Sequence, residues 1–141
     1  MKCELSNSHL FYAYHIRSAF LVFEQALRKL LNEMDVTLEN FYILQCDWGG
    51  EEASFEDIKA HAILSDEEAR LSVNNLIIKG YIVEGAKDGF YALSSEGSVL
   101  RTQLLEAYYE HVFDATKGLS EPTIETALSS LLRFQDNLQR T

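Results

Sequence analysis

The chain has 141 residues, of which 47% are hydrophobic, and its formal net charge is −10. This length and apolar content are typical of one domain with its own core, or of a core with dimerisation arms. No stretch approaches about eighteen uncharged apolar residues and the first residues lack the pattern of a signal peptide, so we expect a cytoplasmic protein without membrane contact.

The first third of the sequence predicts two helices. An amphipathic pattern runs from about Ser8 to Asn32, and its apolar face is too broad for a lone surface helix. Thr37 is a good N-cap for a second helix, which the apolar pattern extends through Trp48 to a stop at Gly49-Gly50.

Residues 54–80 predict a short helix followed by a longer one. Ser54 caps the first, which covers residues 55–62. Residues 65–68 (SDEE) match the S-x-x-E capping box, which predicts the start of the second helix. Gly80 ends that helix as a residue able to adopt a left-handed conformation. The apolar stripe of the second helix recurs at helical period and consists of Ala69, Val73, Leu76 and Ile77.

The next segment predicts a β-hairpin and two further helices. Residues 81–84 and 90–93 read as strands joined by a loop with glycine at both ends. Ser94 or Ser95 then caps a long helix that Gly118 closes. Ser120 caps a final helix, in which Pro122 is tolerated because it lies in the first turn.

Helix, turn, helix and hairpin in this order are typical of a winged helix-turn-helix, whose second helix usually enters the DNA major groove. We therefore predict a mainly α fold with a small β-hairpin in a single chain, 1–141. Residues 36–97 form the winged helix-turn-helix lobe, and residues 1–35 and 98–141 form a helical dimerisation region. Its large apolar faces would be costly to leave in water, so we expect a homodimer. The alternative is that these helices pack on each other within a monomer.

The acidic charge is concentrated in the predicted lobe. Residues 1–49 carry 6 acidic and 4 basic residues, residues 50–97 carry 10 and 4, and residues 98–141 carry 6 and 4. The net charges are therefore −2, −6 and −2. Because DNA affinity usually comes from lysine and arginine displacing counterions, this distribution argues against unaided DNA binding.

Four segments together resemble the MarR family of bacterial transcriptional regulators. Residues 36–44 (VTLENFYIL) resemble its L-T-x-x-Q-[FW]-x-[VI]-L segment, and residues 76–83 (LIIKGYIV) resemble the close of its recognition helix. Residues 93–97 (LSSEG) are similar to its L-T-x-x-G after the wing, and residues 119–121 (LSE) to the opening of its last helix. The resemblance implies a homodimer with two winged lobes on a palindromic operator, and often a small-molecule or redox signal.

The sequence departs from the family at the residues expected to contact DNA. The family's T-R pair corresponds here to Arg70 and Leu71, and the leading turn of the recognition helix is acidic. These acids either repel phosphates or simply favour the helix dipole. Within the wing, Lys87 beside Asp88 replaces the usual D-x-R pair. The candidate DNA-binding residues are Arg70, Asn74, Asn75, Lys79 and Lys87.

A possible ligand pocket is suggested by aromatic residues with polar tips. Tyr12, His15 and Trp48 would line a pocket for a small aromatic ligand, unless these rings fill the dimer core. Cys3 lies near the N-terminus, where some family members place a redox-sensing cysteine, whereas Cys46 reads as a small core residue. The histidines have no metal-ligand spacing and no catalytic motif is present, so we expect neither a metal, a cofactor nor an enzyme.

Two functions follow from these patterns. The first is a dimeric MarR-like regulator that binds operator DNA through its winged lobe and responds to a ligand. The second is an acidic winged-helix interaction protein that has lost DNA readout and binds a basic partner protein, as an antirepressor or DNA mimic. The scaffold favours the first and the net charge of the lobe favours the second.

Overall fold

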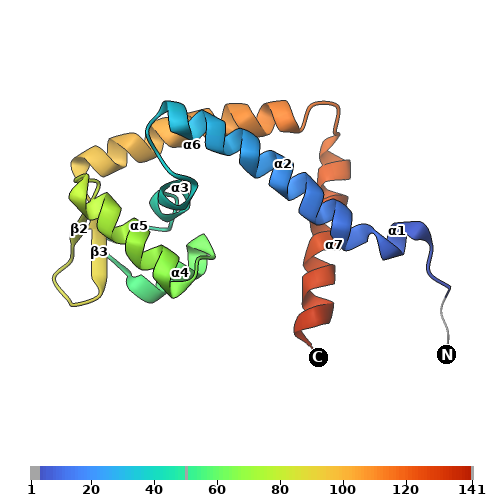
Figure 1. Cartoon of the computed structure of the whole chain (residues 1–141), viewed down its shortest axis with the longest axis horizontal. Helices are drawn as coiled ribbons and strands as arrows, with labels where there is room; N and C mark the ends of the chain where they lie inside the picture. Colours follow the sequence, from blue (N-terminus) through green and yellow to red (C-terminus); the bar gives the residue numbers. More distant parts are fainter. Residues whose placement is uncertain (1–3, 50, 141) are drawn as a thin grey trace. The chain divides into compact units, whose positions relative to one another are not determined.

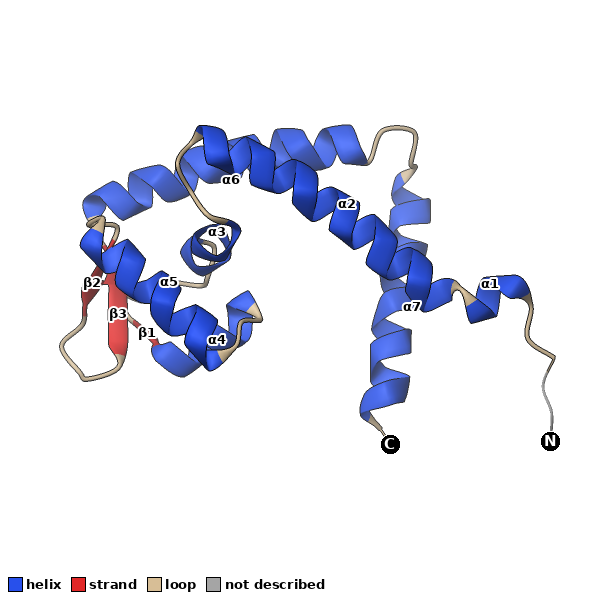
Figure 2. Ribbon diagram, in the orientation of Figure 1, coloured by secondary structure: helices blue, strands red, loops and turns tan. Residues whose placement is uncertain are grey.

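The computed structural model describes residues 4–49 and 51–140, which form seven α-helices and three β-strands (Figure 1). The predicted fold class, mainly α with a small sheet, is confirmed (Figure 2). The chain divides into two compact units, one ending at Glu110 and the other beginning at His111. The elements in chain order are α1 (Asn7–Leu10), α2 (Tyr12–Glu33), α3 (Leu38–Leu44), β1 (Ala53–Ser54), α4 (Phe55–Ala62), α5 (Asp66–Ile78), β2 (Ile82–Glu84), β3 (Phe90–Leu93), α6 (Ser95–Ala115) and α7 (Glu121–Gln139).

The predicted N-caps are present and explain where the helices begin. The Ser54 hydroxyl accepts a hydrogen bond from the Asp57 backbone N–H at 3.1 Å, and Ser120 caps α7 in the same way. Ser65 accepts from the Glu68 N–H at 3.1 Å while the Glu68 carboxylate accepts from the Ser65 N–H at 3.0 Å. This reciprocal capping box satisfies two backbone donors that a helix start otherwise leaves unpaired. The start of α5 is therefore fixed by four consecutive residues.

Two predicted helix boundaries are wrong. The first helix is interrupted at Phe11, whose φ of −104° and ψ of 9° separate α1 from α2. The second helix ends at Leu44 rather than at Trp48. The Leu44 carbonyl accepts from the Trp48 ring N–H at 3.2 Å and from the Arg101 side chain at 2.8 Å. Because a continuing helix would use that carbonyl for the backbone of residue 48, these side chains replace the next helical bond.

The predicted hairpin is confirmed, and a third strand joins it. β2 and β3 pair antiparallel with Val83 opposite Ala92, and β1 pairs with the other edge of β3, giving the order β1-β3-β2. The sequence did not predict β1, because two residues are too few to show a period. This strand ties the start of α4 to the hairpin.

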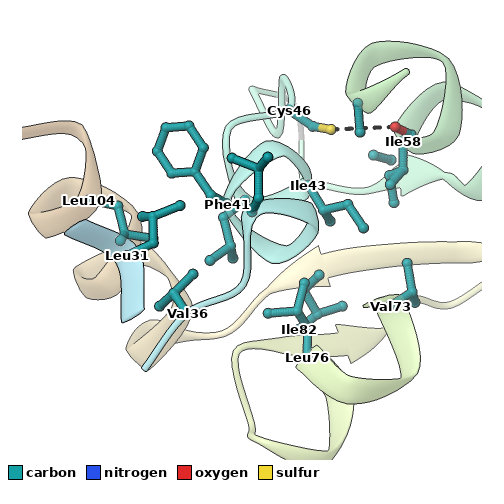
Figure 3. Close-up of a cluster of buried hydrophobic side chains, with 14 of the residues drawn as sticks. Leu31, Val36, Phe41, Ile43, Cys46, Ile58, Val73, Leu76, Ile82 and Leu104 are labelled. Carbon is teal, nitrogen blue, oxygen red and sulfur yellow. Dashed lines mark hydrogen bonds between the residues drawn. The ribbon is translucent and has the colours of Figure 1, made fainter. Parts of the chain in front are cut away.

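The hydrophobic core of the first unit is built around α3 (Figure 3). Phe41, Ile43 and Leu44 of this helix are at most 2% exposed. Leu31 of α2 and Leu104 of α6 pack against the same cluster. The lobe core therefore also includes residues from the helices that flank the lobe in sequence. Other members of the cluster are Leu27, Val36, Leu38, Cys46, Ile58, Val73, Leu76 and Ile82.

Two glycines allow the chain to turn from α5 into the sheet and from the sheet into α6. Gly80 follows Lys79, the C-cap of α5, at a φ of +84°, as the sequence predicted. Gly97 lies in the first turn of α6, where an added Cβ would be 2.0 Å from the Tyr81 carbonyl oxygen. The first turn of α6 therefore lies directly against the backbone that leads into β2.

Several helices expose large apolar side chains. In the second unit, α7 has no buried residue among those described, and Leu128 and Leu132 are more than half exposed. In the first unit, α2 exposes Phe20 and Val22 to a similar degree. None of the described helices has the length and apolar content needed to cross a bilayer. Residues 4–49 and 51–140 contain no group of histidine, cysteine and acidic side chains suited to a metal ion.

Candidate functional site

The exposed face of α5, the second helix of the predicted helix-turn-helix, is the candidate contact surface. Glu67, Leu71, Asn74 and Ile78 recur at helical spacing and therefore lie on one face. All four are exposed, and the apolar pair is unusually open, with Leu71 at 66% and Ile78 at 84%. We call these four residues the α5 stripe. It carries one negative charge, two large apolar groups and no positive charge.

Arg70 lies beside the α5 stripe but is engaged within the lobe. Its Nε donates to the Asp66 carboxylate at 2.8 Å, one helical turn earlier. Its guanidinium carbon also lies 4.6 Å from the centre of the Phe55 ring. The hydrogen bond from Arg70 lowers the pKa of Asp66. The Asp66 carboxylate is therefore charged at neutral pH and remains paired with the Arg70 guanidinium.

The other three basic residues between positions 36 and 97 also contact internal groups. Lys59 pairs with Glu56 at 3.3 Å and with Asp66 at 3.7 Å. The Lys79 ammonium lies 3.9 Å from the Asp35 carboxylate. Lys87 lies 5.7 Å from the centre of the Phe90 ring. Positive charge on the lobe is thus largely directed at the protein itself.

The two predicted asparagines differ in orientation. Asn74 is exposed on the α5 stripe. Asn75 is half-buried, and its side-chain oxygen accepts from the Asn40 amide at 2.9 Å. Asn40 is only 2% exposed and also accepts from the Ser72 hydroxyl. Because buried polar groups need such partners, this network fixes α5 against α3.

The acids at the start of α5 have structural roles. Asp66 holds Arg70, and the Glu68 carboxylate accepts the Ser65 N–H of the capping box. That backbone hydrogen bond lowers the pKa of Glu68. All three acids lie in the first turn of α5, where the helix dipole favours negative charge, and Glu67 also lies on the exposed stripe. Three carboxylates therefore lie at the N-terminal end of α5.

The predicted ligand-binding residues are distributed over two regions. Tyr12 and His15 lie in the first turn of α2, where the Tyr14 and His15 rings meet edge to face at 5.5 Å. Trp48 follows α3 and packs against the core cluster, with its ring N–H on the Leu44 carbonyl. None of these three residues lines the cavity formed by α2, α3 and the turn between α4 and α5.

A cavity of about 260 Å³ lies between α2, α3 and the turn that joins α4 to α5. No local sequence pattern predicts this cavity, because its wall is assembled from three separate segments. Tyr42 donates from its hydroxyl to the Glu24 carboxylate at 3.0 Å in this wall. Burial, and secondarily the bond to Glu24, raises the pKa of Tyr42, so the phenol remains protonated. The lining residues are Phe20, Glu24, Arg28, Leu38, Glu39, Tyr42, Ala62, Ile63, Leu64 and Glu68.

Cys46 is a free cysteine buried in the core. Cys46 is 2% exposed in the core, and burial raises the pKa of its thiol to about 12. It is the small core residue that the sequence predicted, and its protonated thiol is unreactive at neutral pH. Cys3 lies outside the described residues.

Solved structures with this arrangement of helices and hairpin are numerous. A MarR family regulator from Silicibacter pomeroyi matches with a TM-score of 0.78 at 13% identity, covering 96% of each chain. A MarR regulator from Methanosarcina mazei matches with a TM-score of 0.78 at 13% identity, covering 94% of this chain and 99% of its own. The chain has the MarR winged-helix fold. The resemblance seen in the sequence is thereby confirmed for the fold.

A third match concerns a protein whose DNA binding is regulated by a ligand. BpsR of Bordetella bronchiseptica, described as regulated in its DNA binding by 6-hydroxynicotinic acid, matches with a TM-score of 0.72 at 14% identity, covering 96% of this chain and 97% of its own. No protein-family model matches the sequence. The search of curated proteins likewise gives no significant match.

Proposed function

We propose that this chain is a dimeric MarR-like transcriptional regulator that binds operator DNA through the winged lobe. The observation that carries this proposal is the fold, because α5 and the β2–β3 hairpin stand in the order that winged-helix proteins use to contact DNA. Arg70 and Lys87 are the residues we assign to direct contact. Asn74, Asn75 and Lys79 are assigned to contacts with the DNA backbone, and Asn75 and Lys79 make them only if their internal partners release them.

Exposed apolar side chains on the flanking helices support the homodimer. Leu128 and Leu132 of α7 are 55% and 57% exposed, and α2 also exposes large apolar groups. A second copy would cover such surface, which would otherwise cost about 25 cal/mol for each Å² left in water. Sedimentation velocity of the wild type and of Leu128→Glu with Leu132→Glu tests this. We expect a dimer for the former and a monomer for the latter.

DNA binding is tested by fluorescence polarisation with genomic fragments from its own upstream region at low salt. If Arg70 and Lys87 of both protomers neutralise four phosphates, log K falls with log salt at a slope of about −3.6. Arg70→Ala should weaken binding and reduce that slope by about 2 in the dimer. Arg133→Ala, on α7 and outside the lobe, is the control and should leave the slope unchanged. Absence of binding to every fragment at low salt would end this proposal.

A second candidate function is supported by the α5 stripe itself. Leu71 and Ile78 are exposed apolar groups beside Glu67, while the four bases of the lobe contact internal partners. An acidic surface with apolar anchors suits a basic protein partner better than phosphates. The chain would then act as an antirepressor or DNA mimic.

One substitution separates the two functions. Asp66→Asn removes a negative charge and frees Arg70 from its carboxylate partner, while Lys59 keeps its pairing with Glu56. DNA affinity should rise severalfold if the lobe binds DNA, whereas affinity for a basic protein should fall. Asp57→Asn, in the first turn of α4, is the matched control for charge at a helix start. Because the ligand-regulated BpsR shares the fold, a ligand response is part of the proposal, as is a cytoplasmic location.

A further inference from the structure

We propose that the cavity between α2, α3 and the α4–α5 turn binds a small organic cation that carries a flat apolar group. This inference does not depend on DNA binding, since the cavity lies within the first unit and its occupancy can be measured without DNA. It also concerns residues other than Tyr12, His15 and Trp48.

The charges that line the cavity favour a cation. Glu24, Glu39 and Glu68 contribute three carboxylates, and Arg28 is the single basic residue among the ten that line it. The Arg28 guanidinium lies 3.7 Å from the Glu39 carboxylate, so its charge is already directed at an acid of the same wall. The formal charge of the lining is −2. An anionic ligand would meet this negative wall at a cost, whereas an ammonium would be attracted.

The carboxylates retain acceptor capacity for such a ligand. Glu24 accepts one hydrogen bond from the Tyr42 hydroxyl, and Glu68 accepts one from the Ser65 N–H. A carboxylate has two oxygens and about four lone-pair sites, so each of these groups can accept further bonds. An ammonium group offers three donors in a compact volume. The internal hydrogen bonds therefore orient the carboxylates and leave acceptor sites on them for a ligand.

The remaining wall is apolar and aromatic. Phe20 and Tyr42 bring rings to the cavity, and Leu38 closes it from the core side. Aromatic faces attract cations and also stack against flat apolar groups. The volume of about 260 Å³ lies just below the range of about 300–1,000 Å³ typical of drug-sized ligands. The expected occupant is therefore an amine with one small ring system.

Occupancy would connect two parts of the first unit. Glu24 and Arg28 belong to α2, whereas Glu68 belongs to the first turn of α5. A ligand that contacts both would restrain the helix that carries the α5 stripe. Since a ligand shifts an equilibrium by its differential affinity for two states, this contact gives a cation a route to change what the stripe binds.

The test is isothermal titration calorimetry of the full chain with two probes of opposite charge. Tryptamine and indole-3-acetate share an indole ring and differ in carrying an ammonium or a carboxylate. We expect tryptamine to bind at least about tenfold more tightly than indole-3-acetate. Equal binding of the two probes, or binding of indole-3-acetate alone, would overturn the proposal, as would the absence of tryptamine binding at millimolar concentration.

Variants locate the binding in this cavity. Glu39→Gln should weaken tryptamine binding about fivefold, because it removes a half-exposed charge. Glu33→Gln removes an acid from α2 outside the cavity and should change nothing. Phe20→Ala removes a ring of the cavity wall that is 52% exposed, and it should also weaken binding. Tryptamine binding that is unchanged by both Glu39→Gln and Phe20→Ala would show that the cation binds elsewhere.

Discussion

The substitution Gly97→Ala probes the closest approach between α6 and the rest of the lobe. In a helix, alanine is ordinarily more stable than glycine by about 0.5–1 kcal/mol. Here the added Cβ would lie 2.0 Å from the Tyr81 carbonyl oxygen and 2.9 Å from its carbonyl carbon. That carbonyl is held in place, because it accepts the Ser94 N–H at 3.1 Å and the Tyr81 N–H donates to the Leu76 carbonyl at 2.9 Å. The backbone therefore cannot rotate away without losing hydrogen bonds.

The magnitude follows from these opposing contributions. Overpacking a tight site costs about 1–3 kcal/mol and occasionally more, and a fixed backbone clash belongs at the upper end. After the helical gain is subtracted, we expect Gly97→Ala to lower the free energy of unfolding by about 2 kcal/mol. Urea unfolding followed by circular dichroism measures this, at one protein concentration because a dimer's stability depends on it. Ser98→Ala, at the exposed neighbour, should stay within about 0.5 kcal/mol of the wild type. A Gly97→Ala protein as stable as the wild type would refute the close approach of α6.

Two further outcomes are expected. Ile63 has a φ of 56° and is 88% exposed. Because a left-handed conformation is costly for a β-branched residue, Ile63→Asn should raise the free energy of unfolding by about 1 kcal/mol in urea denaturation. An unchanged or lower stability would contradict this. In a Cys3→Ser background, Cys46 should react with a thiol reagent at pH 8 only on unfolding. Burial raises its pKa from 9.0 to about 12, so the unfolded thiol ionises first and its contribution to stability is lost as pH rises from about 9 to 12. Urea unfolding at alkaline pH should show a smaller loss of stability in Cys46→Ala than in the protein that keeps Cys46. An equal loss would contradict the raised pKa of Cys46.

The sequence predicted the helix starts and the hairpin because these depend on neighbouring residues. The capping box at residues 65–68 requires only a serine and a glutamate three positions apart, and the structure contains both of its hydrogen bonds. Gly80 and the strand Phe90–Leu93 were likewise readable from local patterns. The order of these elements was sufficient to predict the fold that the solved MarR structures share.

Features that join distant parts of the chain were not readable in the same way. The end of α3 depends on Arg101, which lies 57 residues away, and β1 forms only because β3 is beside it. The network of Asn40, Ser72 and Asn75 turns a predicted DNA-contacting side chain toward α3. No spacing rule connects these positions, because tertiary packing brings them together.

The charge of the lobe illustrates most clearly which properties come from the sequence and which come from the tertiary structure. Composition alone determined that residues 50–97 carry ten acids against four bases, and so made DNA binding questionable. Only the tertiary structure decided which acids meet those bases, by placing Lys59 of α4 and Arg70 of α5 on the same Asp66. It also gathered three carboxylates from α2, α3 and α5 around one cavity. Charge is a property of the sequence, but electrostatic interaction depends on distances that folding sets.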